Sequence, residues 1–158
     1  TVIGTVGSEE KAALAKAHGC HHTVNYRSED WVARVKELTG GEGVPVVYDS
    51  VCNDTFQGSL ECLKRLGMMV NFGQASGPYN EFHTGMLAPK SLYLTRPTLF
   101  AYNATRAELE ASANALFDVV VSGAVKIEVN QTYPLAEAAQ AHRDLEARKT
   151  TGSTIFVP

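Results

Sequence analysis

The chain has 158 residues, of which 44% are hydrophobic and 20% charged, a balance typical of a globular protein with a substantial core. Its net charge of −3 argues against a nucleic-acid-binding surface, which needs concentrated basic charge, and no apolar run is long enough to cross a membrane. Three cysteines without the spacing of a disulfide framework favour free thiols and a cytoplasmic protein.

The first segment, Val2–Val6, is an apolar run with β-branched residues and predicts a buried strand. Gly7 ends it, and the hydroxyl of Ser8 is a candidate N-cap for a helix over 9–18. A capping box would have Glu or Gln where the chain has Lys11. A cation at this positive helix end is unfavourable unless an anion binds, so Ser8 and Lys11 predict a phosphate site. The alternative is a plain turn with Lys11 in solvent.

Strands and helices alternate along the next part of the chain. A helix capped by Ser28 and ended by Gly40 is predicted from its apolar face. A second helix is expected over 54–63, and strands over 22–26, 44–51 and 67–72. Because parallel strands need such crossovers, the pattern predicts an α/β fold with a doubly wound parallel sheet.

The remaining chain is less regular. Its glycines and prolines predict a loop, and its amphipathic and alternating patterns predict helices and strands. The alternation of apolar and polar residues over 125–129 is typical of a half-exposed strand. In order, we expect a loop over 74–90, a strand over 92–94, a helix over 107–122, a strand over 125–129, a helix over 135–148 and a strand over 154–157.

Four groups of residues stand at the ends of predicted strands, and doubly wound sheets bind ligands beyond the carboxyl ends of their strands. Each group alone is ordinary turn chemistry, but their coincidence at four strand ends favours a binding site. The first strand ends without the carboxylate that selects NAD, which favours NADP. The four groups are Gly7-Ser8, Tyr26-Arg27, Ser50-Val51-Cys52 and Phe72-Gly73-Gln74.

The histidines and cysteines do not predict a metal site. Cys20, His21 and His22 are consecutive, and neighbouring residues of a strand point to opposite faces, so the three cannot converge on one ion. The C-x-x-C and H-E-x-x-H spacings do not occur, and there is no G-x-S-x-G nucleophile elbow.

Four segments carry a resemblance to a known family. They read VIGTVGSEEKAALAKAHGCHHTVNY, TGGEGVPVVYDSV, NFGQASG and LEARKTTGSTIFVP. Together they resemble the NADPH-dependent quinone oxidoreductases, the zinc-free branch of the medium-chain dehydrogenase/reductase superfamily. The resemblance implies a Rossmann-like fold that starts after the family's first strand and glycine-rich loop. Residues 1–124 would be a partial NADPH-binding domain, and residues 125–158 would return to a catalytic domain outside this chain.

The resemblance also implies roles for individual residues. Gly7, Ser8 and Lys11 would bind the 2′-phosphate of NADPH. Further cofactor contacts are implied for Tyr26, Ser50, Val51, Phe72, Gly73, Gln74 and Arg148. The family usually has glycine where this chain has Cys52, so that turn is expected to differ. No catalytic residue is expected here, because the cofactor carries the chemistry and much of the acceptor pocket would lie on the other domain.

The implied activity is hydride transfer from NADPH to a quinone, with little activity in the isolated chain. Family members pair through the strand near 92–95, so a homodimer is expected, which suits an unpaired strand edge. The enzymatic alternative is an enone or enoyl-thioester reductase. The non-enzymatic alternative is a crystallin or RNA-binding role, against which the acidic composition counts.

Overall fold

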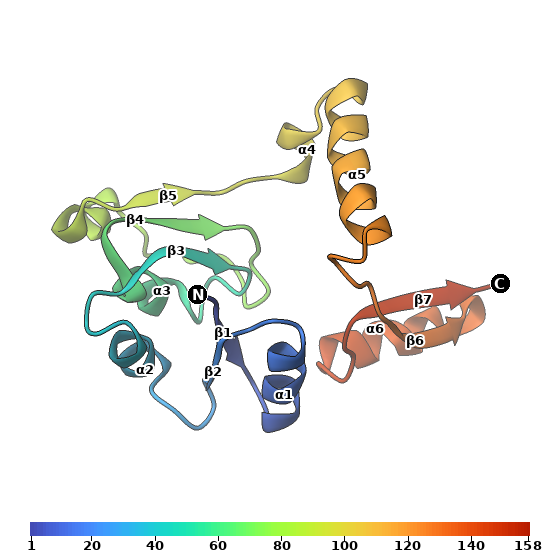
Figure 1. The fold of residues 1–158 in the computed structure, drawn as a ribbon, viewed down its shortest axis with the longest axis horizontal. Helices are drawn as coiled ribbons and strands as arrows, with labels where there is room; N and C mark the ends of the chain where they lie inside the picture. Colours follow the sequence, from blue (N-terminus) through green and yellow to red (C-terminus); the bar gives the residue numbers. More distant parts are fainter. The chain divides into compact units, whose positions relative to one another are not determined.

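The computed structural model describes residues 1–158 and shows a mixed α/β fold in which every strand pair is parallel. The chain divides into two compact units, Thr1–Ala101 and Tyr102–Pro158 (Figure 1). The division predicted at 124/125 concerns a larger protein and stays a prediction. None of the helices combines the length and apolar character that a membrane span requires.

The first unit begins with a β–α–β motif. Strand β1 (Ile3–Val6) pairs with β2 (His22–Asn25), and α1 (Glu9–Ala17) connects them. The predicted N-cap is confirmed, because Ser8 Oγ accepts a hydrogen bond from Lys11 N at 3.2 Å. The backbone of α1 therefore starts immediately after the end of β1.

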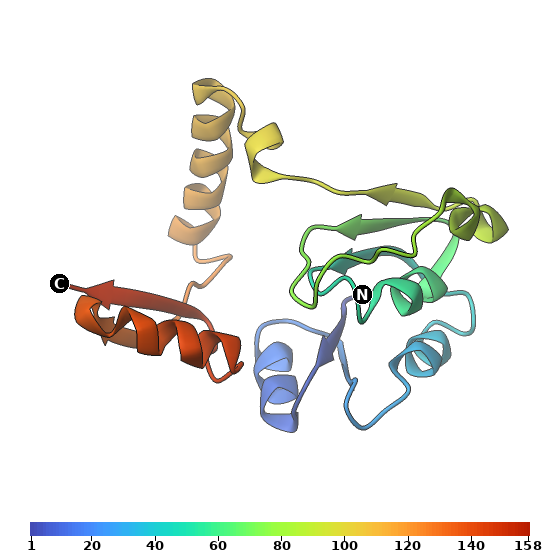
Figure 2. The same cartoon turned by 180° about the vertical axis from the view of Figure 1, so that it is seen from behind.

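The three-stranded sheet of the first unit has the order β3-β4-β5 (Figure 2). The strands are β3 (Val44–Asp49), β4 (Leu63–Asn71) and β5 (Tyr93–Thr95). Helix α3 (Phe56–Cys62) connects β3 to β4, and α2 (Trp31–Leu38) precedes β3. The strands thus form separate two- and three-stranded sheets within this chain.

Helix α2 starts later than predicted. Asp30 Oδ1 accepts from Ala33 N at 3.0 Å, so Asp30 is its N-cap and the prediction of Ser28 was wrong. Ser28 N instead donates to Asn25 O at 3.1 Å, in the turn that follows β2. Because this turn includes the residues in front of α2, the helix begins later along the chain than predicted.

The core of the first unit lies between α3 and the three-stranded sheet. Its members are the buried side chains of Cys52, Phe56, Leu60, Leu63 and Met69. The segment expected to be a loop contains a 3-10 helix, η1 (Thr84–Lys90), which packs against this cluster through apolar side chains. The ammonium group of Lys90 donates to the carbonyls of Glu61 at 2.9 Å and Leu63 at 2.6 Å, which joins η1 to the end of α3.

The second unit contains two longer helices and a parallel strand pair. After the short α4 (Leu99–Tyr102), the elements are α5 (Arg106–Val121), β6 (Val129–Pro134), η2 (Leu135–Glu137), α6 (Ala138–Glu146) and β7 (Ser153–Val157). The strand predicted over 125–129 was wrong, because the strand begins at Val129, where pairing with β7 begins. Alternation alone does not locate a strand that depends on a partner 20 or more residues away.

Gly58 lets α2 pack closely on α3, because a Cβ atom there would lie 2.7 Å from Cη2 of Trp31. We therefore expect Gly58→Ala to lower the free energy of unfolding by about 1–2 kcal/mol, since overpacking outweighs the gain in helix propensity. In the Trp31→Phe background, which lacks the two nearest ring atoms but keeps Val32 Cγ2 at 3.0 Å, the same change should cost less. Urea unfolding of the four chains measures this coupling, and equal effects in both backgrounds would contradict the packing argument.

Candidate functional site

The ends of β1 and β2 meet at Gly7. A Cβ atom at this position would lie 2.6 Å from the hydroxyl oxygen of Tyr26 and 3.5 Å from Nε of Arg27. The side chains that follow β2 therefore lie directly over the turn that follows β1. A larger side chain at this position would displace the tyrosine hydroxyl.

The negatively and the positively charged groups at this end of the two strands have different surroundings. Glu9 Oε1 accepts from the side-chain amide of Asn25 at 3.1 Å, and Glu29 Oε1 accepts from its backbone N–H at 2.8 Å. Both carboxylates are thus held by Asn25. Lys11 is half-buried on the first turn of α1, and the side chain of Arg27 is exposed beside Gly7. Arg27 was identified as a strand-end residue but was not included among the predicted cofactor-binding residues. Its position as a cation directly after a predicted strand was the signal that could have added it.

The ends of β3 and β4 are packed backbone to backbone. A Cβ atom at Gly73 would lie 2.5 Å from the carbonyl oxygen of Ser50 and 2.8 Å from its Cα. The N–H of Ala75 donates to the Ser50 carbonyl at 3.1 Å, and that of Ser76 to the Val51 carbonyl at 2.9 Å. The structure therefore brings two predicted groups together, Ser50-Val51 and the segment from Phe72 to Gln74. Gly73 is required by Ser50, which the sequence alone did not indicate.

Asp49 organises the turn that follows β3. This carboxylate is buried, with 5% of the residue exposed, and its Oδ1 accepts from the N–H groups of Val51 at 2.8 Å and Cys52 at 3.0 Å. The hydroxyl of Thr55 donates to both carboxylate oxygens, and that of Ser59 donates to Oδ2 at 2.9 Å. Thr55, at the N-cap position of α3, therefore caps no helix N–H with its side chain.

Cys52 adopts a conformation that favours glycine. Its φ is +73°, in the left-handed region, which costs a residue with a Cβ about 1 kcal/mol or more. The residue is 5% exposed and belongs to the core cluster, so packing offsets part of that cost. The turn thus keeps a backbone shape suited to glycine while carrying a buried thiol.

The last residue of β4 has a buried amide, and the residue after it has an exposed aromatic ring. Phe72 is 51% exposed, and its N–H donates to the Asp49 carbonyl at 2.9 Å. Gln74 is exposed, and its carbonyl accepts from Gly77 N at 2.9 Å in the next turn. Asn71 is 5% exposed, and its Nδ2 has no hydrogen-bond partner. Such a buried amide is a place for an internal water molecule, and sequence reasoning did not identify it.

Arg148 lies in the second unit, just beyond α6. It has a left-handed φ of +58°, and its N–H donates to the Leu145 carbonyl at 3.0 Å. The next residue, Lys149, is held by Asp144 twice: its N–H donates to the Asp144 carbonyl at 3.0 Å, and its ammonium to Oδ1 at 3.3 Å. Asp144 therefore holds the chain directly after Arg148.

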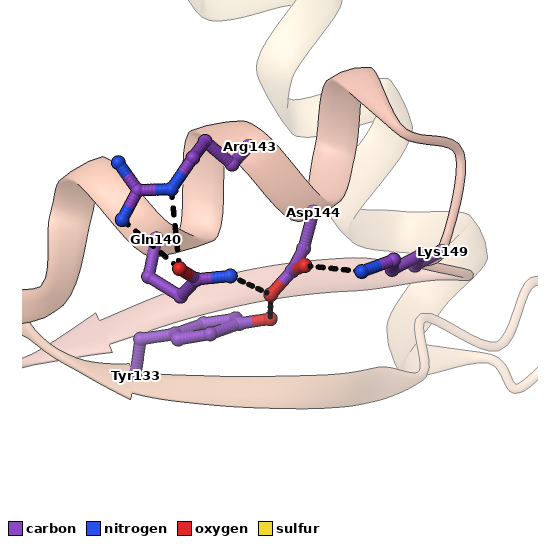
Figure 3. Close-up of polar contacts among 5 residues, drawn as sticks. All are labelled: Tyr133, Gln140, Arg143, Asp144 and Lys149. Atoms are coloured by element: carbon purple, nitrogen blue, oxygen red, sulfur yellow. Dashed lines mark hydrogen bonds and ion pairs between the residues drawn. The ribbon is translucent and has the colours of Figure 1, made fainter.

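The Asp144 carboxylate is the centre of a polar network between α6 and β6 (Figure 3). Its Oδ2 accepts from the side-chain amide of Gln140 at 3.0 Å and from the hydroxyl of Tyr133 at 3.1 Å. The Gln140 hydrogen bond, aided by those of Tyr133 and Lys149, holds the pKa of Asp144 below its usual range. Partial burial, with the bond to Asp144, raises the pKa of Tyr133.

The predicted site residues thus form two clusters in the first unit and one position in the second. Gly7, Ser8, Lys11 and Tyr26 lie at the ends of β1 and β2, and Ser50, Val51, Phe72, Gly73 and Gln74 lie at the ends of β3 and β4. The structure brings together no group of three or more His, Cys, Asp or Glu side chains that could hold a metal ion. The contact of these residues with a cofactor stays a prediction.

Comparison with known proteins gives consistent matches along the chain. Residues 18–155 match a family model described as zinc-binding dehydrogenase. A quinone oxidoreductase of Pseudomonas aeruginosa is 51% identical over 99% of this chain and 49% of its own length. A 2-haloacrylate reductase of a Burkholderia species is 45% identical over 100% of this chain and 48% of its own length. The chain therefore spans about half the length of the curated relatives it matches.

A solved structure shares the fold as well as the sequence. The quinone oxidoreductase of Escherichia coli, complexed with NADPH, is 49% identical and superimposes with a TM-score of 0.94. The match covers 99% of this chain and 49% of that chain.

The lowered pKa of Asp144 predicts an acid-dependent contribution to stability. A carboxyl group whose pKa falls on folding stabilises the protein above its unfolded value of about 4, and that contribution is lost as the pH falls through the lower folded value. We therefore expect Asp144→Asn to lower the thermal unfolding temperature at pH 7 and to differ less from the parent chain below about pH 4. Asp118→Asn, an exposed carboxylate on α5, is the matched control. A pH-independent difference for Asp144→Asn would contradict this assignment.

Proposed function

The chain belongs to the quinone oxidoreductase branch of the zinc-binding dehydrogenase family, and we propose that it is the cofactor-binding portion of an NADPH-dependent quinone oxidoreductase. The observation that carries the proposal is the likeness to a relative solved with NADPH, over nearly the whole of this chain. The activity is proposed for the whole protein, since its relatives are about twice as long. Its cytoplasmic location stays a prediction.

A doubly wound, Rossmann-like sheet is part of the proposal. In it, β1-β2 and β3-β4-β5 are two parts of one sheet, joined by a strand that precedes this chain. The strand order supports this arrangement, because β1 and β3 each have one edge without a partner. The exposure of Val46 at 40% and Tyr48 at 74% on β3 also supports it, since interior strands of such sheets are covered on both faces.

The residues at the strand ends fit an NADPH molecule. Ser8 and Lys11, with the N–H groups of the first turn of α1, would bind the 2′-phosphate, and Tyr26 would border it. Glu9 supports a preference for NADPH over NADH, because its carboxylate already accepts a hydrogen bond from the side chain of Asn25. The contact of Arg148 with the cofactor stays a prediction from the family resemblance.

The second cluster would hold the nicotinamide end. Ser50 and Val51 would present backbone groups to the cofactor, and Gly73 and Gln74 would lie along its ribose. The half-exposed ring of Phe72 offers an apolar surface that would exclude water. When bound, NADPH supplies a hydride, which a quinone accepts. The residues present do not fit a zinc ion, so no step of this proposal uses one.

A second candidate function is reduction of an activated carbon–carbon double bond, as in an enone or enoyl-thioester reductase. The identity of 45% to a 2-haloacrylate reductase favours it as the alternative. Oxidation of NADPH by the complete protein with a quinone, and separately with a 2-haloacrylate, distinguishes the two. A crystallin or RNA-binding role stays a third alternative, which a gel shift with a salt titration tests.

We expect Lys11→Glu to weaken NADPH binding by about ten- to a hundredfold, the effect of losing one charge-assisted contact to the phosphate. NADH binding should change little, because NADH lacks the 2′-phosphate. Titration of the chain with each coenzyme by isothermal calorimetry measures both constants. Lys16→Glu, the same charge change in the last turn of α1, is the matched control. Equal loss of both coenzymes, or no loss, would contradict the assignment.

We also propose that the protein forms a homodimer through β5. This strand is at the edge of its sheet, and Tyr93 on it is 57% exposed. An unpaired edge offers N–H and C=O groups to a second copy.

Tyr93→Lys should therefore reduce the dimer fraction, because it brings two like charges to a shared edge. Light scattering after size exclusion measures the mass of the parent chain and the variant over a range of concentrations. Tyr102→Lys, an exposed aromatic residue on the short helix α4 and not on a strand, controls for the loss of apolar surface. A parent chain that stays monomeric, or equal effects of both variants, would refute pairing through β5.

A further inference from the structure

Asp49 is the most heavily hydrogen-bonded side chain of the second cluster, and no predicted role includes it. Its donors are the N–H groups of Val51 and Cys52 and the hydroxyls of Thr55 and Ser59. Two of these donors belong to the turn after β3, and the other two lie at the N-cap position and in the middle of α3. The carboxylate therefore connects the turn to the helix and to the end of its own strand.

The conformation of the turn after β3 is restricted by the groups around it. Cys52 is held at a φ of +73°, which a residue with a Cβ adopts only when its surroundings require it. The two consecutive N–H groups that bond to Asp49 Oδ1 impose that shape. On the opposite side, Ser76 holds the same turn: its N–H and hydroxyl both donate to the Val51 carbonyl, and its hydroxyl accepts from Asp54 N at 3.0 Å.

We propose that Asp49 is a positioning residue, which holds the backbone of Ser50 and Val51 in the shape that receives the nicotinamide end of the cofactor. The inference rests on the proposed function, because it assigns the turn to the cofactor. Asp49 is 5% exposed and both of its carboxylate oxygens accept hydrogen bonds from the chain, so we assign it a role through the turn. Its removal takes the acceptor away from two turn N–H groups and from the hydroxyl of Ser59, and Cys52 and Ser59 are both buried.

Two buried thiols allow this role to be separated from a general contribution to stability. Cys52 is in the turn and is 5% exposed, whereas Cys62 is at the end of α3 and is 2% exposed. Global unfolding exposes both thiols together, while loosening of the turn exposes Cys52 alone. The ratio of their labelling rates by a thiol reagent, read by mass spectrometry of peptides, therefore reports on the turn.

We expect Asp49→Ala to raise the labelling rate of Cys52 relative to Cys62, and to weaken NADPH binding, each by about tenfold or more. Asp49→Asn should restore both, because its carbonyl can accept from Val51 and Cys52 while the two hydroxyls rotate to accept from its NH₂. Asp54→Ala, which removes a nearby exposed carboxylate, is the charge control and should change neither. Ser59→Ala removes one donor on the helix side and should leave the ratio unchanged, so it serves if Asp49→Ala does not fold.

The outcomes separate this inference from the proposed function. Selective labelling of Cys52 with weakened NADPH binding in Asp49→Ala, and recovery of both in Asp49→Asn, supports the positioning role. Equal acceleration of both thiols, an altered ratio in Ser59→Ala, or selective labelling with unchanged NADPH affinity overturns it. Failure of the parent chain to bind NADPH overturns the proposed function and the cofactor role of Asp49, while the thiol ratio still shows whether Asp49 holds the turn.

Discussion

The direct contact between the backbones of Gly73 and Ser50 is the constraint on which the second cluster depends. Two parallel strands end at the same level there, and no side chain separates them. Because the contact is so close, each turn limits the conformations of the other. Asp49 holds the first turn from within the core, and Ser76 joins it to the second. Backbone groups fixed in this way can face a ligand without rearrangement.

The first cluster is built on a different principle. Tyr26 lies over Gly7. Asn25 donates hydrogen bonds to two carboxylates near this turn, and the positively charged side chains take no part in those hydrogen bonds. One cluster therefore depends on shape and the other on charge. This division suits a ligand with a planar ring at one end and an extra phosphate at the other.

Local patterns predicted much of this architecture, and distant contacts account for what they missed. Val2–Val6 and Val44–Val51 were recognisable as strands, and Ser8 as a cap, because these signals lie within a few residues. Ser28 and Asp30 both have N-cap chemistry, and the preceding turn decided between them. Gly73 was recognised from the sequence as a turn glycine. The structure shows that glycine is required there because the backbone of Ser50, 23 positions earlier, leaves no room for a side chain. Thr55 and Ser59, one helical turn apart, were an available sign that their hydroxyls share a partner.

The attachment of η1 has a consequence for chemical modification. The ammonium of Lys90 donates to two main-chain carbonyls at the junction of α3 and β4, which are 29 and 27 residues away. Acylation of that nitrogen would abolish its charge and enlarge it, so it could no longer reach between the carbonyls. The 3-10 helix η1 would then be held on the core cluster by its apolar side chains alone, without its polar attachment to the end of α3.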